Sequence, residues 1–237
     1  MGGIRVRTGI QVKGISKKIG DQQILEDVDI TCLCKSITGI IGRNGSGKTV
    51  LLKCICGLLK PDKGNIYILE KSGNEEALRL GSIGALIEIP SFLSNYSGLK
   101  NLELLYGIHN RVNRKYLKEI MLSVGLDPEK RKAVKKYSIG MKQRLGIAQA
   151  IMEKQEIVIL DEPMNGLDIE GVQQIKQLLI QLKNEGRTIL LVSHNHEDIE
   201  ELCDAVYEMS MGKSNRKNKM FVLSGSFYRN YILDCKK

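Results

Sequence analysis

The 237-residue chain contains no tryptophan and only three phenylalanines, and none of its apolar runs approaches the ~20 residues that a membrane span needs. Its first residues, MGGIRVRTGIQVKG, lack the continuous apolar core of a signal peptide. Val6 occupies the place of the Ser or Thr that a myristoylation signal requires. We therefore expect a cytoplasmic protein that does not itself cross a membrane.

Cysteine is present, but not in a pattern that binds zinc. Four of the six cysteines form two close pairs, Cys32/Cys34 and Cys54/Cys56, with one residue between the partners. This spacing matches neither CxxC nor another zinc-ligand pattern. We interpret these cysteines as small, buried apolar residues in a reducing compartment.

Positive charge exceeds negative charge, and the formal net charge is +9 at pH 7. The excess is concentrated in two runs, EKRKAVKK at 129–136 and GKSNRKNK at 212–219. Nucleic-acid binding is one interpretation of such runs, but neither contains an aromatic residue on which a base could stack. The alternative is a solvated basic surface, or one that contacts an acidic partner or membrane headgroups. We expect no direct action on nucleic acid.

The order of apolar patterns predicts an α/β fold. Short alternating strands fill the N-terminal third, and EIVILDEP (156–163) and TILLVSH (188–194) each contain a short, wholly apolar strand. Between Pro90 and Lys154, apolar residues at three- and four-residue spacing predict helices at 99–106, 115–124 and 138–152. A strand–helix alternation of this kind places its ligand beyond the carboxyl ends of the strands. The helical stretch is then an insertion.

A phosphate-binding loop is the strongest motif. GRNGSGKT, at 42–49, matches GxxxxGK[ST] in full, between an apolar strand and a helix. Its glycines let backbone N–H groups curl around phosphate oxygens, and the helix N-terminus adds its positive end. Lys48 is expected to reach the β- and γ-phosphates, and the Thr49 hydroxyl to ligate Mg²⁺. The residues predicted to bind nucleotide here are Gly42, Asn44, Gly45, Ser46, Gly47, Lys48, Thr49 and Val50.

Two carboxylates end the strand IVILDE. We assign Asp161 to the metal, through water, and Glu162 to the proton of an attacking water. The two acids could instead mark a helix start, since Pro163 follows, but a buried carboxylate without a cation is costly. No NKxD-like guanine-recognition motif follows, so ATP is favoured over GTP.

A second serine–glycine turn, YSIGM at Tyr137–Met141, precedes a predicted helix and lies between the phosphate loop and the acidic strand. With those elements it resembles the ATP-binding subunit of ABC (ATP-binding cassette) transporters, over nearly the whole chain. The family signature LSGGQ is matched at Ser138 and Gly140 but not at Ile139 or Met141. The resemblance implies that this turn closes over the γ-phosphate bound to the other protomer of a head-to-tail dimer.

The resemblance assigns roles to further residues. NGLD, ending at Asp168, resembles the D-loop that crosses the dimer interface. His194 resembles the switch histidine that contacts the γ-phosphate and is expected to act in catalysis with Glu162 and Lys48. His109 and His196 carry no such resemblance and are expected at the surface.

Two positions depart from the family pattern. The aromatic residue that usually stacks on adenine, near the end of the first strands, is replaced by Ile19, and apolar contact could substitute for stacking at some cost in affinity. The glutamine that usually touches Mg²⁺ and the attacking water is Glu88. We expect Glu88 to remain a metal-binding and catalytic residue and to convey the nucleotide state to a membrane partner.

The phrases GALIEIPSF, YSIGMKQRLGIAQAI and MNGLD resemble one branch in particular, the bacitracin- and lantibiotic-resistance exporters of Gram-positive bacteria. This implies an ATPase at the cytoplasmic face of the cell membrane. It would act as a homodimer, or a heterodimer with a related ATPase, on integral membrane permease subunits. The alternatives are another cargo (an ion, lipid or drug) or a soluble ATP switch acting on the ribosome or nucleic acid.

The resemblance also implies a domain organisation. Residues 1–237 form a single ATP-binding domain with an α/β P-loop NTPase fold of the ABC-ATPase type. A RecA-like core and an antiparallel β subdomain occupy 1–89 and 155–237, and the inserted helical subdomain is 90–154.

Overall fold

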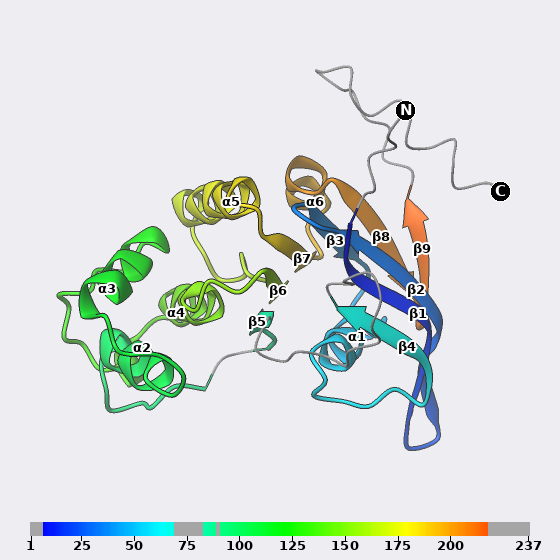
Figure 1. Ribbon diagram of the computed structural model, residues 1–237, viewed down its shortest axis with the longest axis horizontal. Helices are drawn as coiled ribbons and strands as arrows, with labels where there is room; N and C mark the ends of the chain where they lie inside the picture. The colour runs from blue at the N-terminus through cyan, green and yellow to red at the C-terminus, as the bar shows by residue number, and fades with distance from the viewer. Residues whose placement is uncertain (1–6, 69–82, 89–90, 218–237) are drawn as a thin grey trace.

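The computed structural model describes residues 7–68, 83–88 and 91–217, which form two sheets and a group of helices (Figure 1). The smaller sheet is antiparallel, with strand order β2-β1-β4. Its strands are β1 (Thr8–Ile19), β2 (Gln22–Leu33) and β4 (Lys63–Ile68). Ile19 pairs with Gln22 across the tight turn between β1 and β2, where Gly20 takes the left-handed conformation that such turns favour (φ +57°).

The larger sheet has the strand order β5-β6-β7-β3-β8-β9. Its first five strands are parallel, and β9 runs antiparallel to β8. The strands are β3 (Ile37–Ile41), β5 (Ile83–Leu86), β6 (Ile157–Asp161), β7 (Thr188–Val192), β8 (Ala205–Ser210) and β9 (Lys213–Lys217). Every residue of β3, β6 and β7 is buried, as expected of central parallel strands covered on both faces.

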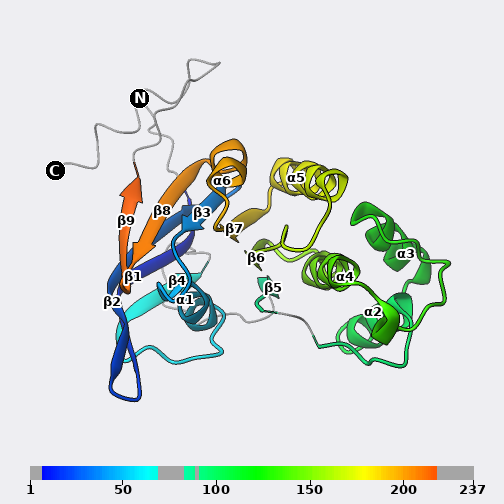
Figure 2. The same cartoon turned by 180° about the vertical axis from the view of Figure 1, so that it is seen from behind.

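The helices separate into two groups. Helices α2 (Gly98–Tyr106), α3 (Arg114–Ser123) and α4 (Ile139–Ile151) gather at one end, away from the smaller sheet, in both views (Figures 1 and 2). The remaining helices are α1 (Lys48–Ile55), α5 (Ile169–Asn184) and α6 (His196–Leu202), and a short 3₁₀ turn spans Val134–Lys136. The helices predicted in the insertion are confirmed to within one residue at each end.

Two apolar cores lie on opposite faces of the larger sheet, because side chains alternate along a strand. In β6, Ile157 and Ile159 pack with α1 and the smaller sheet. Val158 and Leu160 pack on the other side, with residues of α2 to α6. Full burial of each such side chain is worth about 1.5–3 kcal/mol, so β6 is fixed firmly and its acidic end is held in place.

The carboxyl ends of the parallel strands bring the predicted site together. The phosphate loop follows β3, the two acids end β6, His194 follows β7, and Glu88 follows β5. Asp161 pairs in register with Val192 of β7. The α/β fold predicted from the sequence is confirmed. The hairpin β8–β9 and the helix α6 were not predicted.

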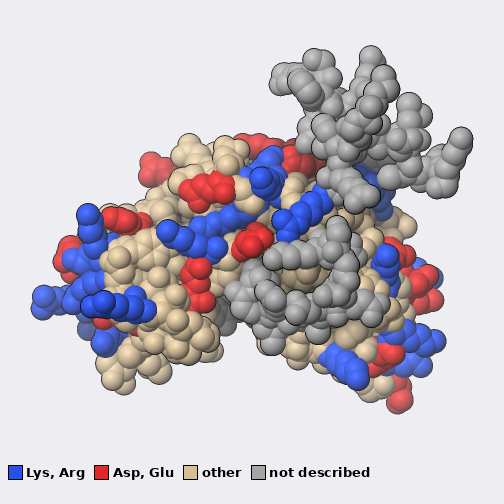
Figure 3. All heavy atoms as spheres, in the orientation of Figure 1, with Lys and Arg blue, Asp and Glu red and all other residues tan. Residues whose placement is uncertain are grey.

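The two basic runs are placed differently. The first lies between α3 and α4, and Figure 3 shows Lys and Arg side chains over the α2–α3 end of the molecule. The described part of the second forms β9, the edge strand. Across 7–68, 83–88 and 91–217 no helix combines the length and the apolarity needed to cross a membrane.

The four paired cysteines form no disulfide. Cys32, Cys54 and Cys56 are buried, as predicted, while Cys34 is half-buried. Burial raises the pKa of the Cys32 and Cys56 thiols to about 12. These thiols are therefore protonated at neutral pH and unreactive.

Candidate nucleotide-binding site

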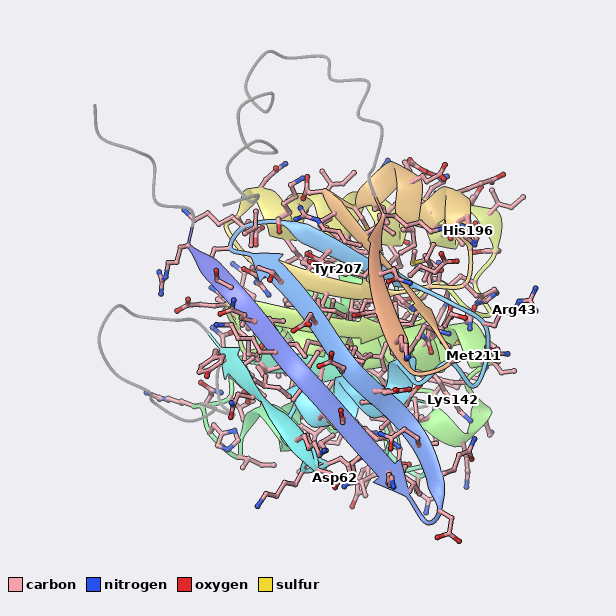
Figure 4. The ribbon with its side chains drawn as sticks, turned by 90° about the vertical axis from the view of Figure 1, so that its right-hand side faces the viewer. Arg43, Asp62, Lys142, His196, Tyr207 and Met211 are labelled. Atoms are coloured by element: carbon pink, nitrogen blue, oxygen red, sulfur yellow. The ribbon has the colours of Figure 1, made fainter. Side chains whose placement is uncertain are left out.

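Steric crowding explains the glycines of the phosphate loop. A Cβ on Gly42 would lie 2.3 Å from the carbonyl oxygen of Met209 at the end of β8. Gly47 has φ +99°, and a Cβ there would approach Leu25 and the carbonyl of Ile24 on β2 within 3 Å. The loop is therefore held between β2 and the β8–β9 turn, and Figure 4 shows Arg43 and Met211 at the same edge of the molecule.

Lys48 is the buried cation of this loop, whereas Arg43 is exposed. The ammonium of Lys48 donates to the carbonyl oxygens of Gly42 (2.6 Å) and Arg43 (3.0 Å). The hydroxyl of Ser46 is also buried, and it has no hydrogen-bond partner within the described part of the chain. A buried ammonium beside an unpartnered hydroxyl at a helix N-terminus suits a phosphate group, which would accept from both.

A hydroxyl and a carboxylate meet where a cation would accompany that phosphate. Thr49 Oγ1 donates to Asp161 Oδ2 at 2.9 Å. Burial is the main cause that raises the pKa of the buried Asp161 carboxyl, and the charges of Glu162 and Glu88 add to it, against the hydrogen bond from Thr49. A nearby cation would offset these unfavourable effects, so the donor set fits a hard divalent ion such as Mg²⁺.

The protein offers few ligands to such an ion. No group of three or more His, Cys, Asp or Glu side chains that could hold a metal occurs in the described ranges.

Glu162 and His194 are in direct contact. His194 Nδ1 lies 2.8 Å from Glu162 Oε2. Glu162 has φ +49°, a conformation that is uncommon for a residue with a side chain and is concentrated at functional sites. Three hydrogen bonds hold its backbone there: its N–H donates to the carbonyl of Val192 (2.9 Å), and its carbonyl oxygen accepts from Gln143 Nε2 (2.9 Å) and from the N–H of Asn165 (3.1 Å). The alternative of a helix start at these acids is wrong, since α5 begins only at Ile169.

Glu88 follows β5, also with a positive φ of +61°. Its carboxylate accepts from the ammonium of Lys53 on α1 at 2.8 Å. The sequence analysis did not identify Lys53. The signal was available, since Lys53 follows Thr49 by four residues and so lies on the same face of the helix.

The serine–glycine turn begins α4. Ser138 caps this helix by accepting from the N–H of Met141 at 3.2 Å. A Cβ on Gly140 would lie 2.6 Å from the carbonyl oxygen of Gly166, so the turn packs on the segment before α5. Ile139 is 74% exposed.

The segment beside this turn ends at another helix cap. Asp168 accepts from the N–H of Gly171 at 2.9 Å and caps α5. Ile169, the next residue, is 85% exposed. Asp168 Oδ1 also lies 3.7 Å from the guanidinium of Arg144 on α4. This ion pair joins the two helices near their starts, where Ile139 and Ile169 are exposed.

The remaining predicted residues lie at the surface. Ile19 ends β1 and is 51% exposed. His109 and His196 are exposed, as predicted. His109 contacts Glu153 at 3.4 Å, and Figure 4 shows His196 at the start of α6.

These features define a class of protein, the P-loop nucleotide hydrolases. The glycine loop follows β3, two acidic residues stand at the end of β6, and a histidine follows β7. Residues 25–165 match the family model described as ABC transporter. The chain belongs to this family. It is the ATP-binding subunit of an ABC transporter and an ATPase.

The relatives agree with the predicted branch. The chain is 38% identical over 211 residues to an uncharacterised ABC transporter ATP-binding protein of Bacillus subtilis, YybJ, covering 89% of this chain and 97% of that protein. It is 38% identical over 239 residues to the bacitracin transport ATP-binding protein BcrA of Enterococcus faecalis (95% of this chain, 78% of that protein). The lantibiotic transport ATP-binding protein SrtF of Streptococcus pyogenes is 32% identical (86% and 88%).

A solved structure supports the fold assignment. The bacterial ABC transporter cassette MJ0796, described as a dimer, superposes with a TM-score of 0.78 at 25% identity, covering 89% of this chain and 98% of that chain. The resemblance to the ABC family and to its bacitracin and lantibiotic branch is therefore confirmed.

Proposed function

We propose that this ATPase works as a dimer with Mg²⁺–ATP and drives export of peptide antibiotics by separate membrane subunits. The observation that carries the ATP chemistry is the contact between Glu162 and His194 beside the Thr49–Asp161 pair and the buried Lys48. The cargo rests on the similarity to BcrA, a bacitracin transport protein, over 95% of the chain.

In the proposed reaction a water oxygen attacks the γ-phosphorus of ATP, and the bond from that phosphorus to the β–γ bridging oxygen breaks. Glu162 accepts the proton of the water, and His194 orients Glu162 through their 2.8 Å contact. Lys48 exchanges its two loop carbonyls for oxygens of the β- and γ-phosphates. Thr49 and Asp161 would hold Mg²⁺, which when bound neutralises charge on these phosphates.

The α4–α5 surface supplies the second half of each site in this proposal. Ser138 and Gly140 of one protomer approach the γ-phosphate bound by the Gly42–Thr49 loop of the other, and Asp168 lies at the protomer contact. The helix N-terminus favours an anion, and the exposed Ile139 and Ile169 become buried against the partner.

Glu88 and Ile19 complete the proposed site. Glu88 acts near the cation and couples the nucleotide state to the permease, and Ile19 lies against the base. The helical region, 90–154, and the remainder, 1–89 and 155–237, form two subdomains of one ATP-binding domain. The chain works at the cytoplasmic face of the cell membrane, attached to its permease.

The function is tested in two steps. The purified chain should hydrolyse ATP in the presence of Mg²⁺, and a Glu162→Gln variant should retain ATP without turnover. A strain lacking the gene and its adjacent permease should become sensitive to bacitracin or a lantibiotic, and the wild-type pair should restore resistance where the Glu162→Gln pair does not. Normal turnover by Glu162→Gln would contradict the mechanism, and unchanged sensitivity to these peptides would contradict the cargo.

A further inference from the structure

The Lys53–Glu88 ion pair joins α1 to the end of the edge strand β5. Lys53 Nζ lies 2.8 Å from Glu88 Oε1. Thr49 and Lys53 are four residues apart on α1, so their side chains lie on one face, one turn apart. The pair therefore lies along the side of α1 on which the Thr49 hydroxyl meets Asp161.

Strand pairing brings a third carboxylate to this edge. Leu86, two residues before Glu88, pairs with Leu160 of β6, which directly precedes Asp161 and Glu162. A cation bound here would be surrounded by more negative charge than it would be if position 88 held a neutral side chain. Lys53 supplies a single positive charge that offsets it.

The geometry of the pair suits a reversible contact. The side chains of Lys53 and Glu88 are 35% and 59% exposed, so water competes with the bond, and such pairs change an equilibrium by only about 1.5- to 5-fold. The left-handed backbone of Glu88 (φ +61°) is uncommon for a residue with a Cβ and is typical of functional positions.

We propose that Lys53 is a positioning residue for Glu88. Its ammonium holds the carboxylate while the site lacks nucleotide, and it limits the negative charge that Glu88 presents to the cation that accompanies ATP. This inference rests on the proposed function, in which Glu88 belongs to the Mg²⁺–ATP site. Lys53 thus lets a carboxylate occupy this position without excessive affinity for the metal.

The test is a double-mutant cycle with Mn²⁺ as the probe, because its binding can be followed by electron paramagnetic resonance without turnover. The affinity of Mn²⁺ for the ADP-loaded protein is measured for wild type, Lys53→Gln, Glu88→Gln, the double variant and Lys53→Arg. Lys118→Gln serves as the control for net charge, because it removes a cation from another ion pair, between Lys118 on α3 and Glu129 in the segment that follows this helix.

We expect Lys53→Gln to tighten Mn²⁺ binding about two- to fivefold. The Mg²⁺ concentration that gives the half-maximal ATPase rate should fall by the same factor. Lys53→Arg and Lys118→Gln should stay near wild type, and Lys53→Gln should have no effect in the Glu88→Gln background. Unchanged binding in Lys53→Gln, or equal tightening without Glu88, would overturn the role of Lys53 and leave the proposed function intact. Wild-type protein that binds neither ADP nor Mn²⁺ would overturn both.

Discussion

The two turns that the proposed function assigns to phosphate, Gly42–Thr49 and Ser138–Gly140, differ in the partners of their polar groups. At the Gly42–Thr49 loop two polar side chains already have partners within the fold: Lys48 donates to loop carbonyls and Thr49 donates to Asp161. At the Ser138–Gly140 turn the serine caps its own helix and Ile139 is exposed. The first turn is a formed half-site, whereas the second is an exposed surface that the proposed function assigns to the contact with the partner protomer.

Both turns require a glycine, but the glycine packs against a different part of the structure in each. Gly42 is needed because the carbonyl of Met209 fills the space where its Cβ would lie, which fixes the loop for phosphate. Gly140 is needed because the carbonyl of Gly166 lies close, which joins the start of α4 to the segment before α5. The first close approach packs the loop against β8, and the second packs the start of α4 against the segment that precedes α5.

The largest effect is expected at the formed half-site. Replacing Glu162 by Gln removes the proton acceptor but keeps the shape and the contact with His194, so the ATPase rate should fall about 10²- to 10⁴-fold. Steady-state phosphate release measures this. ATP affinity, from equilibrium binding of a fluorescent ATP analogue, should change little. A rate within a few-fold of wild type would show that Glu162 is not the base.

The partner-dependent surface is tested by Ser138→Arg. An arginine there places bulk and charge at the proposed protomer contact, so the ATPase rate should fall at least about tenfold while the monomer still binds ATP. Ser97→Arg is the matched control, since Ser97 caps α2 in the same way by accepting from the N–H of Lys100. Each variant loses a cap worth about 1 kcal/mol. If Ser138→Arg and Ser97→Arg lost the same amount of activity, the loss would come from the missing helix cap and not from the protomer contact.

The residues of the formed half-site could be predicted from the sequence, because local geometry brings them together. A glycine loop, its lysine and the acids at the tip of an apolar strand are fixed by local geometry and by the convergence of parallel strands at one edge. Short stretches of the chain therefore carried enough information to assign Lys48, Thr49 and Asp161, and the structure brings these residues together.

Contacts between residues that are far apart in the chain could not be predicted from the sequence. Lys53 and Glu88 are 35 residues apart, and only the packing of β5 beside β6 brings the carboxylate to α1. The strand β9 was missed for a related reason: its sequence, KSNRK, reads as a solvated basic run, yet at the sheet edge it pairs with β8 and leaves its side chains largely in solvent.

A moderate effect on stability is expected at Asp161. Its raised pKa, caused mainly by burial, means that the ionised carboxylate destabilises the nucleotide-free fold at neutral pH. Asp161→Asn should therefore raise the melting temperature, by about 2–4 °C for each kcal/mol gained. The gain should shrink as the pH falls through the raised pKa, because the wild-type group then becomes neutral in the fold. An unchanged or lower melting temperature would contradict this, and Asp21→Asn, at the exposed β1–β2 turn, is the control.

The smallest effect is expected at Ile19. Replacing it by tyrosine should add stacking worth about 0.5–1.5 kcal/mol and tighten ATP binding about two- to twelvefold, with a smaller gain for CTP. Ile19→Leu keeps an aliphatic side chain and should bind as wild type does. Equilibrium titration with both nucleotides checks this. Equal affinities of the wild type, Ile19→Tyr and Ile19→Leu would show that residue 19 does not contact the base.

The comparison between the two turns is tested most directly by mixing two inactive proteins. Lys48→Ala disables the formed half-site and Ser138→Arg disables the surface, but a mixed dimer contains one site with both parts intact. A 1:1 mixture should recover about a quarter of the wild-type ATPase rate if dimers form at random and each site acts alone. Activity no greater than the sum of the two separate proteins would contradict a site built from two copies of the chain.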